Sequence, residues 1–234
     1  MKNSYGFYKM DRACHLFYYY FLLLKDYLDM RKKIIVIEDA VNREKSVLKS
    51  KTNRIDFPLS DENKNTIMIM KEILFALDGV GLAAPQIDIN KNIAVIYIPE
   101  SASLLRDNAK IYPMHVLINA GYEPVENDGK YSDFEGCYSV RSVYGKVPRY
   151  NTIKLNYQNE DGLEISTIET GFYARVLQHE IDHLNGLLIT DRLSSDCPQG
   201  TFAEMSKLRR DSLSEEKKIV FDELLKQKGL AQNE

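Results

Sequence analysis

Helical spacing of apolar residues marks several segments of the chain. Between residues 61 and 78, apolar side chains recur every three or four positions with charged residues between them, which predicts an amphipathic helix. We expect Gly79 to end this helix in the left-handed conformation that glycine tolerates. A second helix is predicted over 172–185, and a charged amphipathic stretch over 204–228 predicts one further helix or two.

Short runs of β-branched and apolar residues alternate with turn residues elsewhere. These runs predict strands at residues 34–37, 93–98, 116–119, 122–125, 152–157 and 163–168. The pair Asp161-Gly162 between the last two runs indicates a hairpin turn. Strands in the middle of the chain, with helices before and after them, favour a single α+β domain.

The first thirty residues differ from the rest. Apolar and aromatic residues fill positions 15–24, a run shorter than the roughly 20 residues of a membrane-spanning helix. No small-residue cleavage site follows, so a signal peptide is disfavoured and no stable membrane insertion is expected. Three interpretations stay open: a docked helix, a membrane-surface segment, or an extension before a true start at Met30. We divide the chain into an extension at 1–29 and a single domain at 30–234, whose C-terminal helical region begins near residue 203.

Composition places the chain among ordinary globular proteins. Of its 234 residues 44% are hydrophobic and 28% charged, and the 12 Gly, 7 Pro and 3 Cys exclude collagen-like, disordered and disulfide-scaffold classes. The net charge of −3 gives no electrostatic reason to expect direct nucleic-acid recognition. Cys14, Cys137 and Cys197 are odd in number and far apart, which favours a reducing compartment.

The strongest chemical signal is an H-E-x-x-H motif formed by His179, Glu180 and His183. Positions i and i+4 are neighbours on one face of a helix, so both imidazoles can bind one metal ion. The glutamate lies beside the first histidine, close enough to reach a water on that ion without being a ligand. The motif therefore predicts a metal-dependent hydrolase.

The histidines leave a third metal ligand to be found. The metzincin pattern fails, because Ile189 stands where its third histidine would be. One remaining candidate is Cys137, whose thiolate with two imidazoles would give a soft site with an open position. The other is a glutamate on a later helix, as in zinc endopeptidases, for which Glu204, Glu215 and Glu216 are candidates.

Three segments occur in an order that is typical of one family. They are 79–86 (GVGLAAPQ), 135–137 (EGC) and 178–184 (QHEIDHL), and together they closely resemble the signature motifs of the peptide deformylases. The resemblance covers about residues 60–193. It implies an α+β fold of mixed, largely antiparallel sheets around a central metal-binding helix, with a C-terminal helix after them.

The resemblance implies an enzyme that removes the formyl group from the initiator methionine of nascent polypeptides, giving formate and a Met-peptide. It implies that Cys137, His179 and His183 hold one divalent ion, with water in the fourth position. Ferrous iron is the ion that the family implies, while zinc, nickel and cobalt stay open because the ligands alone do not separate them. Glu180 would take a proton from the water and deliver it to the leaving amine.

The family's other site residues carry over by position. The side-chain amide of Gln86 and the backbone N–H of Tyr138 would donate to the developing oxyanion, beside the backbone of Gly81 and Leu82. The substrate-binding residues that the resemblance implies are Val80, Phe172, Val176 and Glu135. The first three would line an apolar pocket for the methionine side chain, and Glu135 is also expected to pair with an arginine, Arg149.

The chain departs from the family pattern in several places. Tyr138 stands where leucine is usual, Arg141 where proline is common, and residues 38–46 replace the usual N-terminal motif. We expect the bulkier Tyr138 ring to narrow the substrate groove. Every group that the chemistry needs is present, so an active enzyme is expected. A zinc endopeptidase and a degenerate, non-catalytic binding protein are the alternatives.

The partners expected are formyl-Met nascent peptides, in the bacterial cytoplasm. The ribosome is a further candidate, through the charged residues of 204–228. A solvated helix face is the simpler explanation of the same charges.

Overall fold

The computed structural model of the chain describes residues 33–39, 46–106 and 109–227. The predicted extension at 1–29, and the start proposed at Met30, lie outside the described residues. Among the residues that are described, no helix has the length and apolar character needed to cross a membrane.

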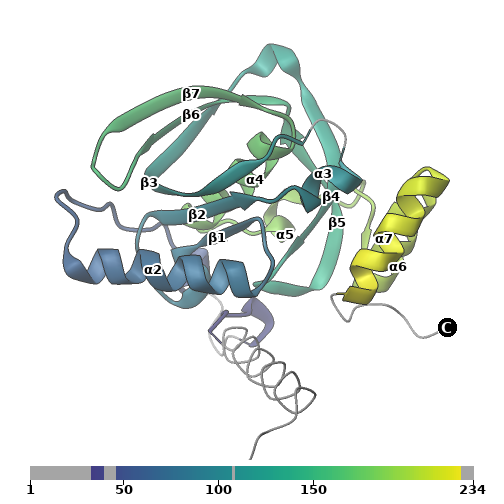
Figure 1. Cartoon of the computed structure of the whole chain (residues 1–234), viewed down its shortest axis with the longest axis horizontal. Coiled ribbons are helices and arrows are strands. Elements are labelled where there is room, and N and C mark those ends of the chain that lie inside the picture. The colour runs from purple at the N-terminus through teal and green to yellow at the C-terminus, as the bar shows by residue number, and fades with distance from the viewer. Residues whose placement is uncertain (1–32, 40–45, 107–108, 228–234) are drawn as a thin grey trace, which may run out of the picture.

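Two antiparallel sheets form the framework (Figure 1). The first has five strands in the order β1-β2-β3-β6-β7, with bounds Gly81–Ala83, Ile93–Ile98, Tyr112–Pro124, Thr152–Gln158 and Glu164–Thr170. The second has three strands in the order β4-β5-β8, with bounds Lys130–Cys137, Val140–Tyr150 and Gln199–Gly200. Every pairing between these strands is antiparallel.

Helices join and cover these sheets, with α2 along one side and α6 and α7 at one end of the molecule (Figure 1). The α-helices are α2 Asp61–Ala76, α3 Ser101–Leu105, α4 Gly171–Leu184, α5 Ile189–Arg192, α6 Phe202–Asp211 and α7 Glu215–Gln227. The 3-10 helices are η1 Ile37–Asp39, η3 Val47–Lys49, η4 Ala84–Ile87 and η5 Glu126–Asp128.

Strand β2 separates the two largest parts of the core. Ile93 and Val95 pack into the cluster that contains the apolar face of α2. Ala94, Ile96 and Ile98 point the other way, into the cluster that contains α4. Because successive side chains of a strand point to opposite faces, α2 and α4 cover opposite faces of the larger sheet. A strand buried on both faces needs an uninterrupted apolar run, which residues 93–98 supply.

The prediction of a strand at 34–37 is wrong. The N–H of Ile35 donates to the carbonyl of Gln86 (2.8 Å), and that of Ile37 donates to the carbonyl of Ser139 (2.9 Å). These bonds reach two separate segments, so no strand ladder forms although the side chains are apolar. The segment thereby joins the glutamine-bearing loop to the turn after β4.

The left-handed residue after α2 is Asp78 (φ 49°), so the prediction that Gly79 takes this conformation is wrong. The N–H of Gly79 donates to the carbonyl of Leu74 (3.2 Å) and closes the helix end. A Cβ atom at Gly79 would lie 2.9 Å from the hydroxyl oxygen of Tyr138. The glycine is therefore required by close packing and not by its backbone angle.

The other element predictions are mostly confirmed. The helices predicted over 61–78 and 172–185 are α2 and α4, and the C-terminal region forms two helices, α6 and α7. The runs 116–119 and 122–125 belong to one strand, β3, whose register shifts beside Asn119 (φ 54°). The predictions omitted β1, β4, β5 and β8. In β4 every residue before the terminal Cys137 is partly or fully exposed, so the strand lacks a strong apolar signal.

Candidate active site

Helix α4 carries both histidines of the H-E-x-x-H motif and holds them rigidly. Leu177, Ile181 and Leu184 are buried in the core on one side of the helix, which fixes its rotation. The rings of His179 and His183 lie one turn apart, with centroids 5.0 Å apart and planes at 76°. The spacing that the motif predicts is therefore realised on a buried, well-anchored helix.

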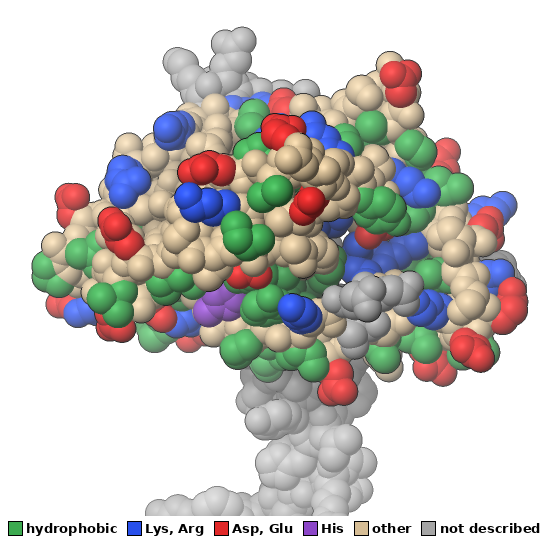
Figure 2. Space-filling view, turned by 90° about the horizontal axis from the view of Figure 1, so that it is seen from above, with side chains coloured by type: hydrophobic (Ala, Val, Ile, Leu, Met, Phe, Trp, Pro, Cys, Tyr) green, Lys and Arg blue, Asp and Glu red, His purple; other side chains and the backbone are tan. Residues whose placement is uncertain are grey.

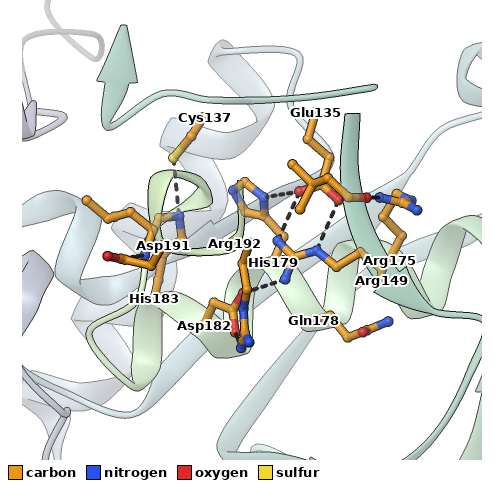
Figure 3. Close-up of polar contacts among 12 residues, drawn as sticks. Glu135, Cys137, Arg149, Arg175, Gln178, His179, Asp182, His183, Asp191 and Arg192 are labelled. Carbon is orange, nitrogen blue, oxygen red and sulfur yellow. Dashed lines mark hydrogen bonds and ion pairs between the residues drawn. The ribbon is translucent and has the colours of Figure 1, made fainter. Parts of the chain in front are cut away.

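Cys137 reaches the same place from the end of β4 (Figure 3). Its Sγ lies 3.3 Å from Nε2 of His183. The ligand atoms of Cys137, His179 and His183 all lie within 4.8 Å of one another. One thiolate and two imidazoles at this separation are a donor set that fits one divalent ion and leaves a position open.

Glu135 lies behind the first histidine and fixes its ring. Nδ1 of His179 contacts Oε2 of Glu135 at 3.0 Å, which leaves Nε2 as the nitrogen for a metal. Arg149 donates to both carboxylate oxygens of Glu135 (3.1 and 2.9 Å), and Arg175 donates to one of them (2.6 Å). The predicted pair of Glu135 with Arg149 is therefore present. Both oxygens of Glu135 are engaged by protein groups, which suits a positioning role.

The charges around these groups explain their acid–base behaviour. Burial alone would raise the pKa of Glu135, but the hydrogen bond from His179 and the positive charge of Arg149 hold it well below its usual value. Burial opposes protonation of His179, yet hydrogen bonds with Cys137 and Glu135 raise its pKa well above the usual value. Burial lowers the pKa of His183. A divalent ion would take the place of the His179 proton, because metal ligands must be deprotonated.

Further contacts clamp α4 to the smaller sheet. Arg149 of β5 connects the smaller sheet to α4, because it also forms an ion pair with Asp182 of α4. Arg192 donates a hydrogen bond to the same aspartate. Gln178 accepts a hydrogen bond from the N–H of Tyr150 and donates to the carbonyl of the same residue, both at 2.9 Å. The charged groups compensate one another in a buried network, as such groups must.

Glu180 follows His179 on α4 and lies against Gly81 of β1. Its side chain is buried, and within the described part of the chain its Oε2 has no hydrogen-bond partner. Burial raises the pKa of Glu180 to about 7, which suits a group that exchanges protons near neutral pH. A Cβ atom at Gly81 would lie only 2.3 Å from its Oε1, so the glycine of β1 makes room for the carboxylate.

The side-chain amide of Gln86 is oriented so that its N–H₂ group points toward the proposed metal ligands. Its Oε1 accepts from the N–H of Ala83 (2.8 Å), which assigns the amide direction. Its Nε2 then lies 3.8 Å from Sγ of Cys137 and 3.4 Å from Oγ of Ser139. The buried amide N–H₂ is thus held beside the metal ligands.

The side chain of Tyr138 makes a tertiary contact that the sequence did not suggest. Its ring packs against the core cluster of α2, and its hydroxyl donates to the carbonyl of Leu77 (3.1 Å). The side chain therefore joins the turn after β4 to the end of α2. Through this contact it braces the loop that begins at Gly79 and leads to Gln86, while its own backbone lies next to Cys137.

We expect Tyr138→Phe to lower the free energy of unfolding by about 1 kcal/mol, because the carbonyl of Leu77 loses its donor. The kcat/KM for formyl-peptide hydrolysis should fall severalfold as the loop loosens. Urea unfolding and initial rates would measure both effects. Tyr131→Phe is the control, since that side chain is 62% exposed. Equal stability of the wild type and Tyr138→Phe would contradict this role.

The predicted methionine-pocket residues are only partly brought together. Val80 and Phe172 line the same cavity. Val176 is buried in the core cluster of α4 and does not line that cavity. The side chain of Leu82 is fully buried, so only its backbone is available to a substrate, as expected for this position.

Sequence reasoning missed Arg175, which lies one turn before His179 on α4 and shares its partner Glu135. An arginine four positions before a metal ligand, within the apolar stretch 172–177 of the helix, could have drawn attention to it. Two of the three glutamates proposed for a zinc endopeptidase are engaged elsewhere. Glu204 caps α6 through Thr201, and Glu215 pairs with Lys218.

An α+β fold with a largely buried Cys/His/His donor set, a buried glutamate beside it and a glutamine amide directed at the cysteine defines a metal-dependent hydrolase of the H-E-x-x-H type. The family model for "Polypeptide deformylase" matches residues 32–199, and the chain belongs to this family. Its members are metal-dependent hydrolases that remove the N-formyl group from nascent polypeptides, and this chain is such an enzyme.

Known peptide deformylases are similar to this chain in sequence and in fold. "Peptide deformylase 2" of Rickettsia conorii is 37% identical over 159 residues, covering 66% of this chain and 78% of the relative. The peptide deformylase of Ligilactobacillus salivarius is 34% identical over 180 residues, covering 70% and 94%. A crystal structure of the Synechococcus elongatus enzyme in complex with actinonin has a TM-score of 0.57 at 30% identity, covering 85% of this chain and 86% of that one.

Proposed function

We propose that the formyl group is removed between α4 and β1, at one divalent ion held by Cys137, His179 and His183. The observation that carries this proposal is the buried Oε2 of Glu180 beside those three ligands, which has no hydrogen-bond partner among the residues that the structure describes. The chemistry that such an ion supplies when bound is that of a Lewis acid, which polarises carbonyl groups and acidifies water. Ferrous iron is the ion proposed, and zinc, nickel and cobalt are the alternatives to be tested.

Glu180 is the proton carrier in this proposal. It takes a proton from the water that attacks the formyl carbon, and it returns that proton to the leaving amine. The C–N bond then breaks to give formate and a peptide with a free amino group. A pKa near 7 allows both transfers at neutral pH.

The negative charge that develops on the formyl oxygen during the reaction needs hydrogen-bond donors to stabilise it. The N–H₂ of Gln86 is held beside Cys137, and the backbone N–H of Tyr138 follows the same cysteine. Donors that are already in place lower the barrier because they need no rearrangement when the charge develops. The backbone of Gly81 and Leu82 would position the peptide beside Glu180.

The methionine side chain would lie against Val80 and Phe172, which line one cavity next to β1. Val176 would support this pocket from the core. An apolar pocket gains free energy from the thioether side chain in proportion to the area removed from water. It would therefore favour methionine over polar first residues.

The test is formate release from a short formyl-Met peptide by protein prepared without oxygen and loaded with ferrous iron. Bound metal would be measured in the same sample, and matched samples would carry zinc, nickel or cobalt. We expect turnover in proportion to metal occupancy. A fully loaded site without formate release would instead support the degenerate, non-catalytic alternative.

The reaction would take place in the bacterial cytoplasm, where nascent chains leave the ribosome, and we propose a weak ribosome contact through α6 and α7. Lys207 is exposed on α6, and Lys207→Glu should reduce salt-sensitive co-sedimentation with ribosomes severalfold. Lys64→Glu on α2 is the matched control, since Lys64 is also exposed. Equal co-sedimentation of both variants and the wild type would exclude this contact.

A further inference from the structure

A cavity of about 260 Å³ begins at the wall proposed for the methionine and extends to a second wall that the proposed site does not use. Its inner wall includes Val80 and Phe172. Its outer wall is the C-terminal helix α7, which contributes Phe221, Leu224 and Leu225. The volume is smaller than that of a pocket for a whole small-molecule ligand, so it suits side chains of a longer ligand, with the methionine against the inner wall and a second side chain toward α7.

Two arginines line this apolar cavity, Arg106 at the end of α3 and Arg209 on α6. Figure 2 shows basic side chains gathered in a hollow on the side of the molecule that carries the C-terminal helices. The Cζ atom of Arg106 lies 4.2 Å from the ring centroid of Phe172. Its guanidinium pairs with Asp133 and donates to the carbonyl of Phe134 (2.9 Å).

Arg209 shares its acidic neighbour, Asp133, with Arg106. Within the described residues its side chain makes no direct hydrogen bond or ion pair, and its guanidinium lies 5.8 Å from the ring centroid of Phe221. Burial lowers the pKa of Arg209, and burial together with Arg209 lowers the pKa of Arg106 to about 10, so Arg106 stays charged at neutral pH. Asp78 also lines the cavity but is exposed at its rim. Two largely buried cations that share one carboxylate, that of Asp133, are costly, and an anionic ligand would offset that cost.

We propose that this cavity binds an acidic side chain at the third residue of the formyl-peptide, with Arg209 and Arg106 holding its carboxylate. The inference rests on the proposed function, because Val80 and Phe172 would meet the methionine. β1 is the edge of the five-stranded sheet, and an edge strand favours an extended ligand. In an extended peptide the first and third side chains point to the same side. Apolar walls suit the stem of a glutamate, and a guanidinium matches its carboxylate.

The test compares C-terminally amidated formyl-Met-Ala-Glu with formyl-Met-Ala-Gln, so that the side chain supplies the only carboxylate. The wild type should show a kcat/KM about tenfold higher for the glutamate peptide, as expected for one charge-assisted hydrogen bond. Arg209→Met keeps the apolar stem and should bring the ratio near one. Arg210→Met is the matched control, because Arg210 is the next residue and pairs with the exposed Asp222. It should keep the preference.

Failure of the proposed subsite can be distinguished from failure of the proposed function. Equal kcat/KM for both peptides in the wild type, or a ratio unchanged by Arg209→Met, would overturn the subsite. A preference that appears only when glutamate is placed at the second residue would overturn the assignment to the third. Dissociation constants of both peptides, measured by calorimetry on the same metal-loaded samples, test the subsite even without turnover. If neither peptide releases formate, the result would instead count against the proposed function.

Discussion

Replacing Glu180 by glutamine is expected to leave the metal in place and to lower kcat for formate release by a factor of about 10² to 10⁴. Glutamine keeps the size of the side chain, so the close contact with Gly81 is preserved. It cannot accept a proton from water or return one to the amine. Initial rates and metal content, measured on one preparation, would separate loss of proton transfer from loss of the ion.

The matched control for this variant is Glu72→Gln on α2, an exposed glutamate away from the site. It should leave kcat unchanged. Loss of the metal together with the rate would mean that Glu180 supports the ligands instead of the chemistry. An unchanged rate would exclude Glu180 as the proton carrier.

Cys137→Ser should weaken the binding of a divalent ion more than about 100-fold, beyond the range typical for losing a group that merely supports a ligand. A hydroxyl is a much poorer ligand than a thiolate for these ions. The cobalt-loaded wild type should show thiolate-to-metal absorption, and the variant should lack it. This spectrum does not depend on activity.

Cys197→Ser is the control, because Cys197 is the other described cysteine and contacts Ser194 outside the site. It should bind cobalt with the same spectrum as the wild type. Retention of tight metal binding and of the spectrum by Cys137→Ser would remove the thiolate from the site. A glutamate third ligand, as in the zinc endopeptidases, would then have to be reconsidered.

The histidine pair and its third ligand differ in how far local sequence could predict them. His179 and His183 are one helical turn apart, so their convergence follows from helix geometry alone. The third ligand lies 46 residues from His183, and the residues themselves left Cys137 and three glutamates open. Order and composition of the three motifs favoured Cys137, and the position of β4 brings its sulfur to the histidines.

The elements missed from sequence share a physical cause. The strand pair β4 and β5 has few buried positions on β4, so its apolar pattern is weak and its formation depends on pairing with β5. Conversely, residues 34–37 are apolar and buried but make backbone bonds to two separate segments. In both cases the partner that decides the backbone conformation lies far away in the chain.

By itself, the sequence determined α2, α4, β2 and the β6–β7 hairpin, together with the two histidines of the proposed metal site. The physical reason is that apolar periodicity, turn residues and helical spacing act within a few residues of one another. Only the tertiary structure decided that Glu135 holds the first histidine, that the ring of Tyr138 braces the end of α2, and that α7 forms the outer wall of the cavity. These features depend on side chains that are distant in the chain and meet only when the sheets and helices pack.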